Sequence, residues 1–129
     1  MYRATTTILL SAITFFISPA ISTVCWGNNF GDAIDNEIWN VAYIQGTVNA
    51  DSDVSPALIN EQGNNPCGTT FNIDNSGFHS GYTLQGCGGD SMWLDQNGQF
   101  HASCTYEPQQ ICPDENNIYT GCFQQQYCC

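Results

Sequence analysis

The 129-residue sequence carries 12 aspartate and glutamate residues against one lysine or arginine, a formal net charge of −11 at pH 7 with neutral histidines. Proteins that bind nucleic acids or anionic membrane surfaces draw most of their affinity from lysine and arginine, so we expect neither as a partner. The composition also argues against phosphoryl transfer, which needs a cation facing the transition-state oxygens. The one cation is Arg3, and no lysine or arginine follows it. Mutual repulsion of the carboxylates should weaken the fold as pH rises, so we expect the best stability in mildly acidic solution.

The first 20 residues predict a signal peptide. Arg3 provides a short positive region, residues 8–17 form an apolar run, and Ser18-Pro19-Ala20 fits the small-x-small pattern of a cleavage site. The apolar run is too short to span a bilayer, and a buried N-terminal helix or a membrane anchor is the alternative. We predict a signal peptide at 1–20 and a single disulfide-rich domain at 21–129, secreted to the extracellular space.

An even number of cysteines in a short exported chain predicts a disulfide framework. The eight cysteines are Cys25, Cys67, Cys87, Cys104, Cys112, Cys122, Cys128 and Cys129. Adjacent Cys128 and Cys129 are poorly placed to bond each other, and we expect Cys25 to pair with one of them and so tie the chain ends together. A zinc site would need closely spaced cysteine pairs, which the long gaps between the middle cysteines do not provide. We expect four disulfides, no metal and no cofactor.

Taken in order, the chain first predicts a helix at 33–45. Ile34, Ile38 and Val41 fall at helical spacing, Asp32 suits the N-cap, and Gly46 suits the position after the last turn. The run at 38–44 is rich in β-formers, so a strand there is the alternative. Residues 47–55 read as a solvated loop without a calcium-binding pattern. Ser55-Pro56 then predicts the start of a short helix that ends at Gly63.

The segment 67–104 carries the hairpin signals. Phe71 and Ile73 alternate with polar residues, and the next strand is expected to place Phe78, Tyr82 and Leu84 on one face. Asn97-Gly98 predicts a type I′ turn with Asp95 opposite Phe100. This register would turn four side chains toward the core: Trp93, Phe100, Ala102 and Cys104. A last strand is expected at 118–126. The predicted fold class is α+β, with one main helix packed on a small antiparallel sheet and crosslinked by disulfides; an all-β sandwich is the alternative.

No motif predicts catalysis, and we expect no catalytic residues and no enzyme activity. Gly88-Gly89-Asp90-Ser91 is similar to the surroundings of some nucleophilic serines but lacks the helix and the ordered partners of such a site. His79 and His101 could act as a general base, although two surface histidines are the simpler interpretation. Trp93 and Tyr106, with these histidines, form the candidate binding surface. The alternative is that the aromatic residues fill a small core.

The whole chain resembles the small cysteine-rich secreted proteins of filamentous fungi, a class that includes plant-pathogen effectors. The resemblance rests on the predicted signal peptide, the eight cysteines, the closing Cys128-Cys129 and a composition rich in Asn, Gly, Gln and Tyr. It implies an extracellular protein, expected as a monomer, that binds a host extracellular protein without catalysis. A lectin-like glycan binder is the first alternative, and a small secreted hydrolase or toxin is the second.

Overall fold

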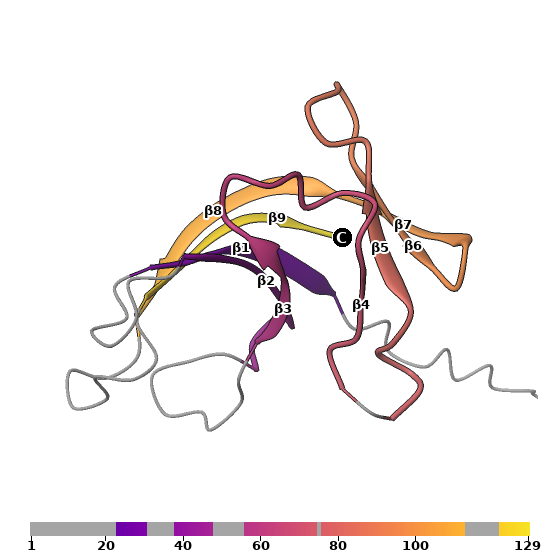
Figure 1. Cartoon of the computed structure of the whole chain (residues 1–129), viewed down its shortest axis with the longest axis horizontal. Coiled ribbons are helices and arrows are strands. Elements are labelled where there is room, and N and C mark those ends of the chain that lie inside the picture. Colours follow the sequence, from indigo (N-terminus) through magenta and orange to yellow (C-terminus); the bar gives the residue numbers. More distant parts are fainter. Residues whose placement is uncertain (1–22, 31–37, 48–55, 75, 113–121) are drawn as a thin grey trace, which may run out of the picture.

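Nine strands in two antiparallel sheets build the described part of the chain in the computed structural model, which covers residues 23–30, 38–47, 56–74, 76–112 and 122–129 (Figure 1). None of these residues lies in a helix, so the described chain is all-β. The α+β prediction is therefore wrong, and the all-β alternative holds. The predicted signal peptide at 1–20, the Asp32 cap and most of the 47–55 loop lie outside the described residues.

The larger sheet has five strands in the order β3-β2-β1-β9-β8. In Figure 1 these strands form an arch, and the second sheet stands across one end of it. The bounds are β1 (Val24–Phe30), β2 (Trp39–Ile44), β3 (Ala57–Glu61), β8 (Thr105–Ile111) and β9 (Cys122–Cys128). Strand β9 confirms most of the predicted last strand, and 118–121 lie outside the described residues.

Both predicted helices are wrong in this sheet. Trp39–Ile44 is strand β2 in place of the second half of the 33–45 helix, and Ala57–Glu61 is strand β3 in place of the short second helix. Val41 and Tyr43 pack on one face of the sheet while Ala42 and Ile44 pack on the other. Because both faces of β2 are apolar, its sequence has no period-2 alternation, and apolar residues at helical spacing occur by coincidence.

The smaller sheet has the order β4-β5-β6-β7. Its strands are β4 (Thr70–Phe71), β5 (Tyr82–Gln85), β6 (Trp93–Gln96) and β7 (Gln99–Ser103). Asn97 and Gly98 join β6 to β7 with φ angles of 51° and 76°, which confirms the type I′ turn. Phe78 lies in the loop before β5 and is 79% exposed, so the prediction that it shares one strand face with the buried Tyr82 and Leu84 is wrong.

A β-bulge in the β6–β7 hairpin moves Ala102 to the face of Leu94, whereas Trp93 and Phe100 stay together on the other face. Asp95 lies opposite Phe100 as predicted, but an extra residue then shifts the register, so that Leu94 pairs with Ala102 and Trp93 with Ser103. Leu94 is buried, whereas Trp93 and Phe100 are exposed. The prediction that Trp93 and Phe100 face the core is therefore wrong.

The core lies mainly between the two sheets and takes side chains from both. Its buried members are Val24, Ala42, Ile59, Phe71, Tyr82, Leu84, Met92 and Leu94. A second cluster covers the opposite face of the five-stranded sheet and is formed by Cys25, Val41, Tyr43, Phe123 and Cys128. The arched sheet is thus apolar on both faces near its centre.

All eight cysteines are paired, as Cys25–Cys128, Cys67–Cys87, Cys104–Cys129 and Cys112–Cys122. This confirms four disulfides and the prediction that Cys25 reaches one member of the terminal doublet. Successive side chains of a strand point to opposite faces, so Cys128 joins the second cluster while Cys129 packs against the core between the sheets. Four disulfides are typical of extracellular proteins.

Candidate functional site

The structure distributes the four predicted binding residues over three places. Trp93 lies on the outer face of the four-stranded sheet, and Tyr106 lies near the start of β8 in the five-stranded sheet. His79, in the loop before β5, and His101, on β7, both contact Tyr82. The four residues therefore belong to three separate sites.

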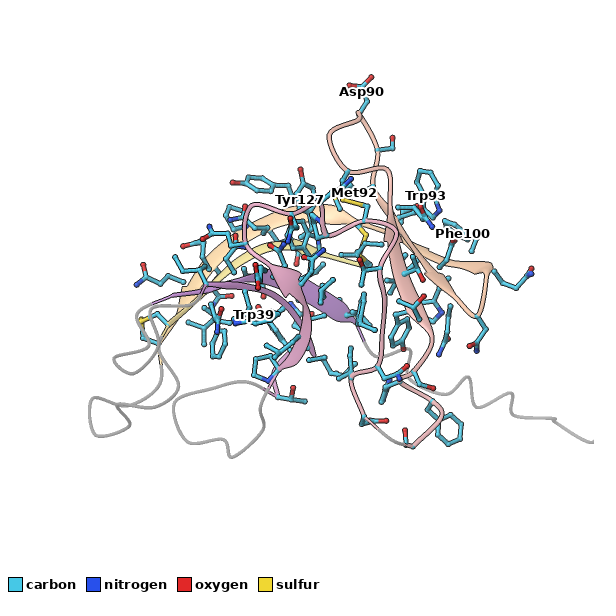
Figure 2. The ribbon with its side chains drawn as sticks, in the orientation of Figure 1. Trp39, Asp90, Met92, Trp93, Phe100 and Tyr127 are labelled. Atoms are coloured by element: carbon cyan, nitrogen blue, oxygen red, sulfur yellow. A yellow bond between two sulfur atoms is a disulfide. The ribbon has the colours of Figure 1, made fainter. Side chains whose placement is uncertain are left out.

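The first site is formed by Trp93 and Phe100 on the outer face of the β6–β7 hairpin, and we call it the Trp93–Phe100 face. Figure 2 shows the two rings on the same side of the hairpin, and they are 37% and 66% exposed. Trp93 is packed against Gly86, where an added Cβ would lie 2.8 Å from the ring atom Cζ3. The glycine lets the indole lie against the backbone, which holds the ring in place.

Three cross-strand partners surround these rings. Gln85 and Ser103 flank Trp93 on the neighbouring strands, and Asp95 lies opposite Phe100. Two apolar rings beside amide, hydroxyl and carboxylate groups match the composition of a protein-binding surface, where aromatic anchors are ringed by polar residues.

The second site is a cleft of about 410 Å³ where the two sheets meet, which we call the Tyr106 cleft. Its walls come from the β5–β6 loop, the β7–β8 junction and β9. The lining residues are Gly89, Asp90, Ser91, Met92, Ser103, Cys104, Thr105, Tyr106 and Tyr127. Figure 2 shows Asp90 at the tip of its loop, with Met92 and Tyr127 below it.

Three aromatic rings on adjacent strands support one wall of this cleft. Tyr106, Tyr127 and Trp26 are successive cross-strand partners on β8, β9 and β1. The Tyr106 and Tyr127 ring centroids are 5.1 Å apart with the planes tilted by 58°, and those of Tyr127 and Trp26 are 5.9 Å apart and stacked. Tyr106 is 57% exposed at the open end of the row.

The third site centres on the buried Tyr82. Its hydroxyl donates to the carbonyl of Phe78 at 3.3 Å and lies 3.4 Å from His79 Nδ1, while the His101 ring meets the Tyr82 ring edge-on at 5.7 Å. Burial raises the pKa of Tyr82, and the charge of Asp74 raises it further. The phenol therefore stays protonated near neutral pH and joins loop to sheet, a structural role.

Asp74 belongs to the same loop. Its carboxylate accepts hydrogen bonds from the hydroxyl and the backbone N–H of Ser76. These two bonds, with a smaller contribution from His79, lower the pKa of Asp74. The loop that carries His79 is thus held by its own polar contacts.

Sequence reasoning missed most of the Tyr106 cleft. Tyr127 stands beside the cysteine doublet, and Asp90 and Ser91 belong to the segment already compared with nucleophilic serines. The described residues hold no group of three or more His, Cys, Asp or Glu side chains that could bind a metal ion. They also include no helix long and apolar enough to cross a membrane.

No family model, curated protein or solved structure matches the chain.

Proposed function

We propose that this chain is a secreted, non-catalytic protein that binds an extracellular host protein through the Trp93–Phe100 face. The observation that carries the proposal is the exposure of these two rings on the outer face of the four-stranded sheet, with the indole packed against Gly86. Tryptophan supplies a disproportionate share of binding energy at protein interfaces, and a fixed ring loses little entropy on binding. The class-level resemblance to secreted fungal effectors supports the same function.

Charge indicates the kind of partner. The chain has no lysine or arginine after Arg3, and Asp95 stands on the same face as the two rings. A partner that presents basic residues around an apolar pocket complements this surface, whereas an acidic partner is repelled. Binding is therefore expected to weaken as salt concentration rises.

The test is a capture experiment with the oxidised, secreted protein immobilised and exposed to plant apoplastic extract. We expect one basic protein to be retained by the wild type and by Phe78→Ala, and lost with Trp93→Ala. Phe78 is the matched control because it is exposed but lies off the face. Titration calorimetry with the purified partner should show at least about a tenfold weaker affinity for Trp93→Ala, as expected for an interface anchor.

Retention of the partner by Trp93→Ala, or the absence of any saturable partner, would overturn the proposal. His79→Gln and His101→Gln provide the comparison with an enzyme. If either substitution abolished the biological effect while folding and partner binding stayed intact, a catalytic function would be favoured instead.

A further inference from the structure

We propose that the Tyr106 cleft binds a neutral saccharide, at a site centred on Tyr106 that borders the Trp93–Phe100 face at Ser103. The cleft joins one exposed aromatic ring to several unpaired polar groups, in a volume of about 410 Å³. Small-molecule sites combine these features: aromatic walls, a few convergent polar groups, and volumes of about 300–1,000 Å³.

The aromatic wall is held in place by contacts within the protein. The Tyr106 ring packs against the Tyr127 ring, which in turn stacks on the Trp26 ring. The strand ends that carry the two tyrosines are tied together, because Cys104 precedes β8 and bonds to Cys129. The exposed side of Tyr106 can therefore receive the C–H face of a sugar ring with little loss of conformational freedom.

The polar wall has unused hydrogen-bonding capacity. Within the described part of the chain, the Asp90 carboxylate and the hydroxyls of Ser91, Ser103 and Thr105 form no hydrogen bond with another residue. A carboxylate accepts hydrogen bonds, and each hydroxyl can both donate and accept. The vicinal hydroxyls of a saccharide match this set, whereas an aliphatic ligand would leave the groups unpaired.

The negative charge at the cleft and on the whole chain favours a neutral sugar over an anionic one. Among the described residues, Asp90 is the only charged one that lines the cleft, and the chain carries a net charge of −11, so a uronic acid or a sulfated sugar is repelled. A cation would engage Asp90 but gain little from the three hydroxyls. A neutral saccharide uses all four polar groups and the ring.

Titration calorimetry of the oxidised protein tests the assignment. The probes are chitin, β-glucan and mannan oligosaccharides, with oligogalacturonate as the anionic and spermidine as the cationic comparison. We expect saturable binding of at least one neutral probe, at least about tenfold weaker in Tyr106→Ala and nearly unchanged in Tyr106→Phe, which keeps the ring. Asp90→Ala, at an exposed loop tip, should weaken the same probe severalfold without affecting the fold.

The proposal is overturned if no neutral oligosaccharide binds, if oligogalacturonate or spermidine binds better, or if Tyr106→Ala binds as well as the wild type. Melting curves and an intact-mass count of four disulfides verify that each variant folds. Trp93→Ala should retain saccharide binding, and Tyr106→Ala should retain the protein partner. Failure of one site therefore does not imply failure of the other.

Discussion

Tyr43 is a buried tyrosine whose hydroxyl donates to Gln125 Oε1 at 2.8 Å, between strands β2 and β9. Gln125 is itself buried and donates through Nε2 to the carbonyl of Glu107 at 2.8 Å. Burial raises the pKa of Tyr43 to about 12. The phenol thus links three strands, β2, β9 and β8, through a single side-chain amide.

Tyr43→Phe is expected to destabilise the fold by about 1–3 kcal/mol at neutral pH, because it leaves the buried Gln125 oxygen unpaired. The raised pKa also predicts a pH dependence. Between the unfolded pKa near 10 and the folded value of about 12, the unfolded state loses its proton first, so stability falls as pH rises. Urea unfolding from pH 7 to pH 12 measures both effects.

The Tyr43→Phe variant is also the control for the predicted pH dependence. Tyr43→Phe lacks the titrating group, so its stability disadvantage should shrink above pH 10. A difference between wild type and variant that stays constant up to pH 12 would contradict the assigned pKa.

Gly86 and Gly88 provide a matched pair for the support of Trp93. Both have positive φ angles, of 76° and 78°. A Cβ at Gly86 would clash with the Ser91 carbonyl oxygen and lie 2.8 Å from Trp93 Cζ3, whereas nothing lies within 4 Å of a Cβ at Gly88. Gly86→Ala is expected to shift the indole and weaken partner capture, while Gly88→Ala retains it. Both variants carry a similar penalty of about 1 kcal/mol for the positive φ. A difference in tryptophan fluorescence and affinity therefore reports the contacts made only at Gly86, with the Ser91 backbone and with the Trp93 ring. Equal behaviour of the two variants would show that Gly86 does not position Trp93.

At the scale of whole elements, a row of side-chain amides crosses all five strands of the larger sheet. Its members are successive cross-strand partners: Gln110, Gln124, Asn28, Asn40 and Asn60. Asn28 Nδ2 donates to Asn40 Oδ1 at 2.6 Å, and Asn40 Nδ2 donates to Asn60 Oδ1 at 2.7 Å. These bonds fix the mutual register of β1, β2 and β3.

Asn40→Ala is expected to destabilise the protein by about 2–4 kcal/mol, because Asn40 is buried and its loss leaves partners on both neighbouring strands unpaired. Gln110→Ala, at the exposed end of the same row, should change stability by less than about 0.5 kcal/mol. Denaturant unfolding of both variants measures the contrast. Equal effects would mean that the row contributes no register-specific stability.

The elements differ in how far sequence predicts them. The Asn97-Gly98 turn is predictable because two adjacent residues with positive φ leave few other conformations. The side-chain faces of that hairpin are not predictable in the same way. Either Trp93 or Leu94 could face the core, and the bulge moves Ala102 from the face of Trp93 to the face of Leu94. Strand β2 reads as a helix because both of its faces are buried by partners distant in the sequence.

The candidate sites were only partly predictable, for a related reason. Trp93 and Tyr106 stand out as aromatic residues among polar ones, which is a local property. The Tyr106 cleft combines Asp90, Ser103 and Tyr127 from three distant segments. Their meeting depends on β9 pairing beside β8 and on the Cys104–Cys129 disulfide, neither of which spacing alone determines.

For the whole molecule, the contribution of each disulfide to the free energy of unfolding should depend on the length of chain that it closes into a loop. Cys25–Cys128 spans 103 residues and Cys112–Cys122 spans 10. Loop-closure entropy predicts that replacing the first pair by alanine costs about 4.7 kcal/mol and replacing the second about 2.7 kcal/mol. Guanidinium unfolding of the two double variants gives the ranking. A larger loss at Cys112–Cys122 would contradict the entropic account.

The charge of the whole molecule predicts a response to salt. Without lysine or arginine after Arg3, repulsion among carboxylates opposes folding at pH 8, and added sodium chloride should raise the melting temperature by screening it. At pH 4, near the isoelectric point of about 4.1, the same salt should have little effect. A melting temperature at pH 8 that does not depend on salt would contradict this prediction.

Asp74 contributes to the loss of folding stability at low pH. Its lowered pKa means that its stabilising contribution is present above the ordinary aspartate pKa and is lost as pH falls through the folded value. Stability should therefore pass through a maximum in mildly acidic solution and decline below it.

The position of β1 in the five-stranded sheet has a consequence for biosynthesis. This central strand pairs with β2 on one edge. Its other edge pairs with β9, which is synthesised last among the strands, and the disulfide partner of Cys25 follows it by 103 residues. At about 5–20 residues per second, a nascent chain spends on the order of 5 to 20 seconds with that edge open. During this interval Cys67, Cys87 and Cys104 are synthesised before Cys128 and can form non-native disulfides with the Cys25 thiol. Native pairing of Cys25 therefore cannot occur before Cys128 is made, and the yield of a producing cell depends on its capacity to reshuffle disulfides.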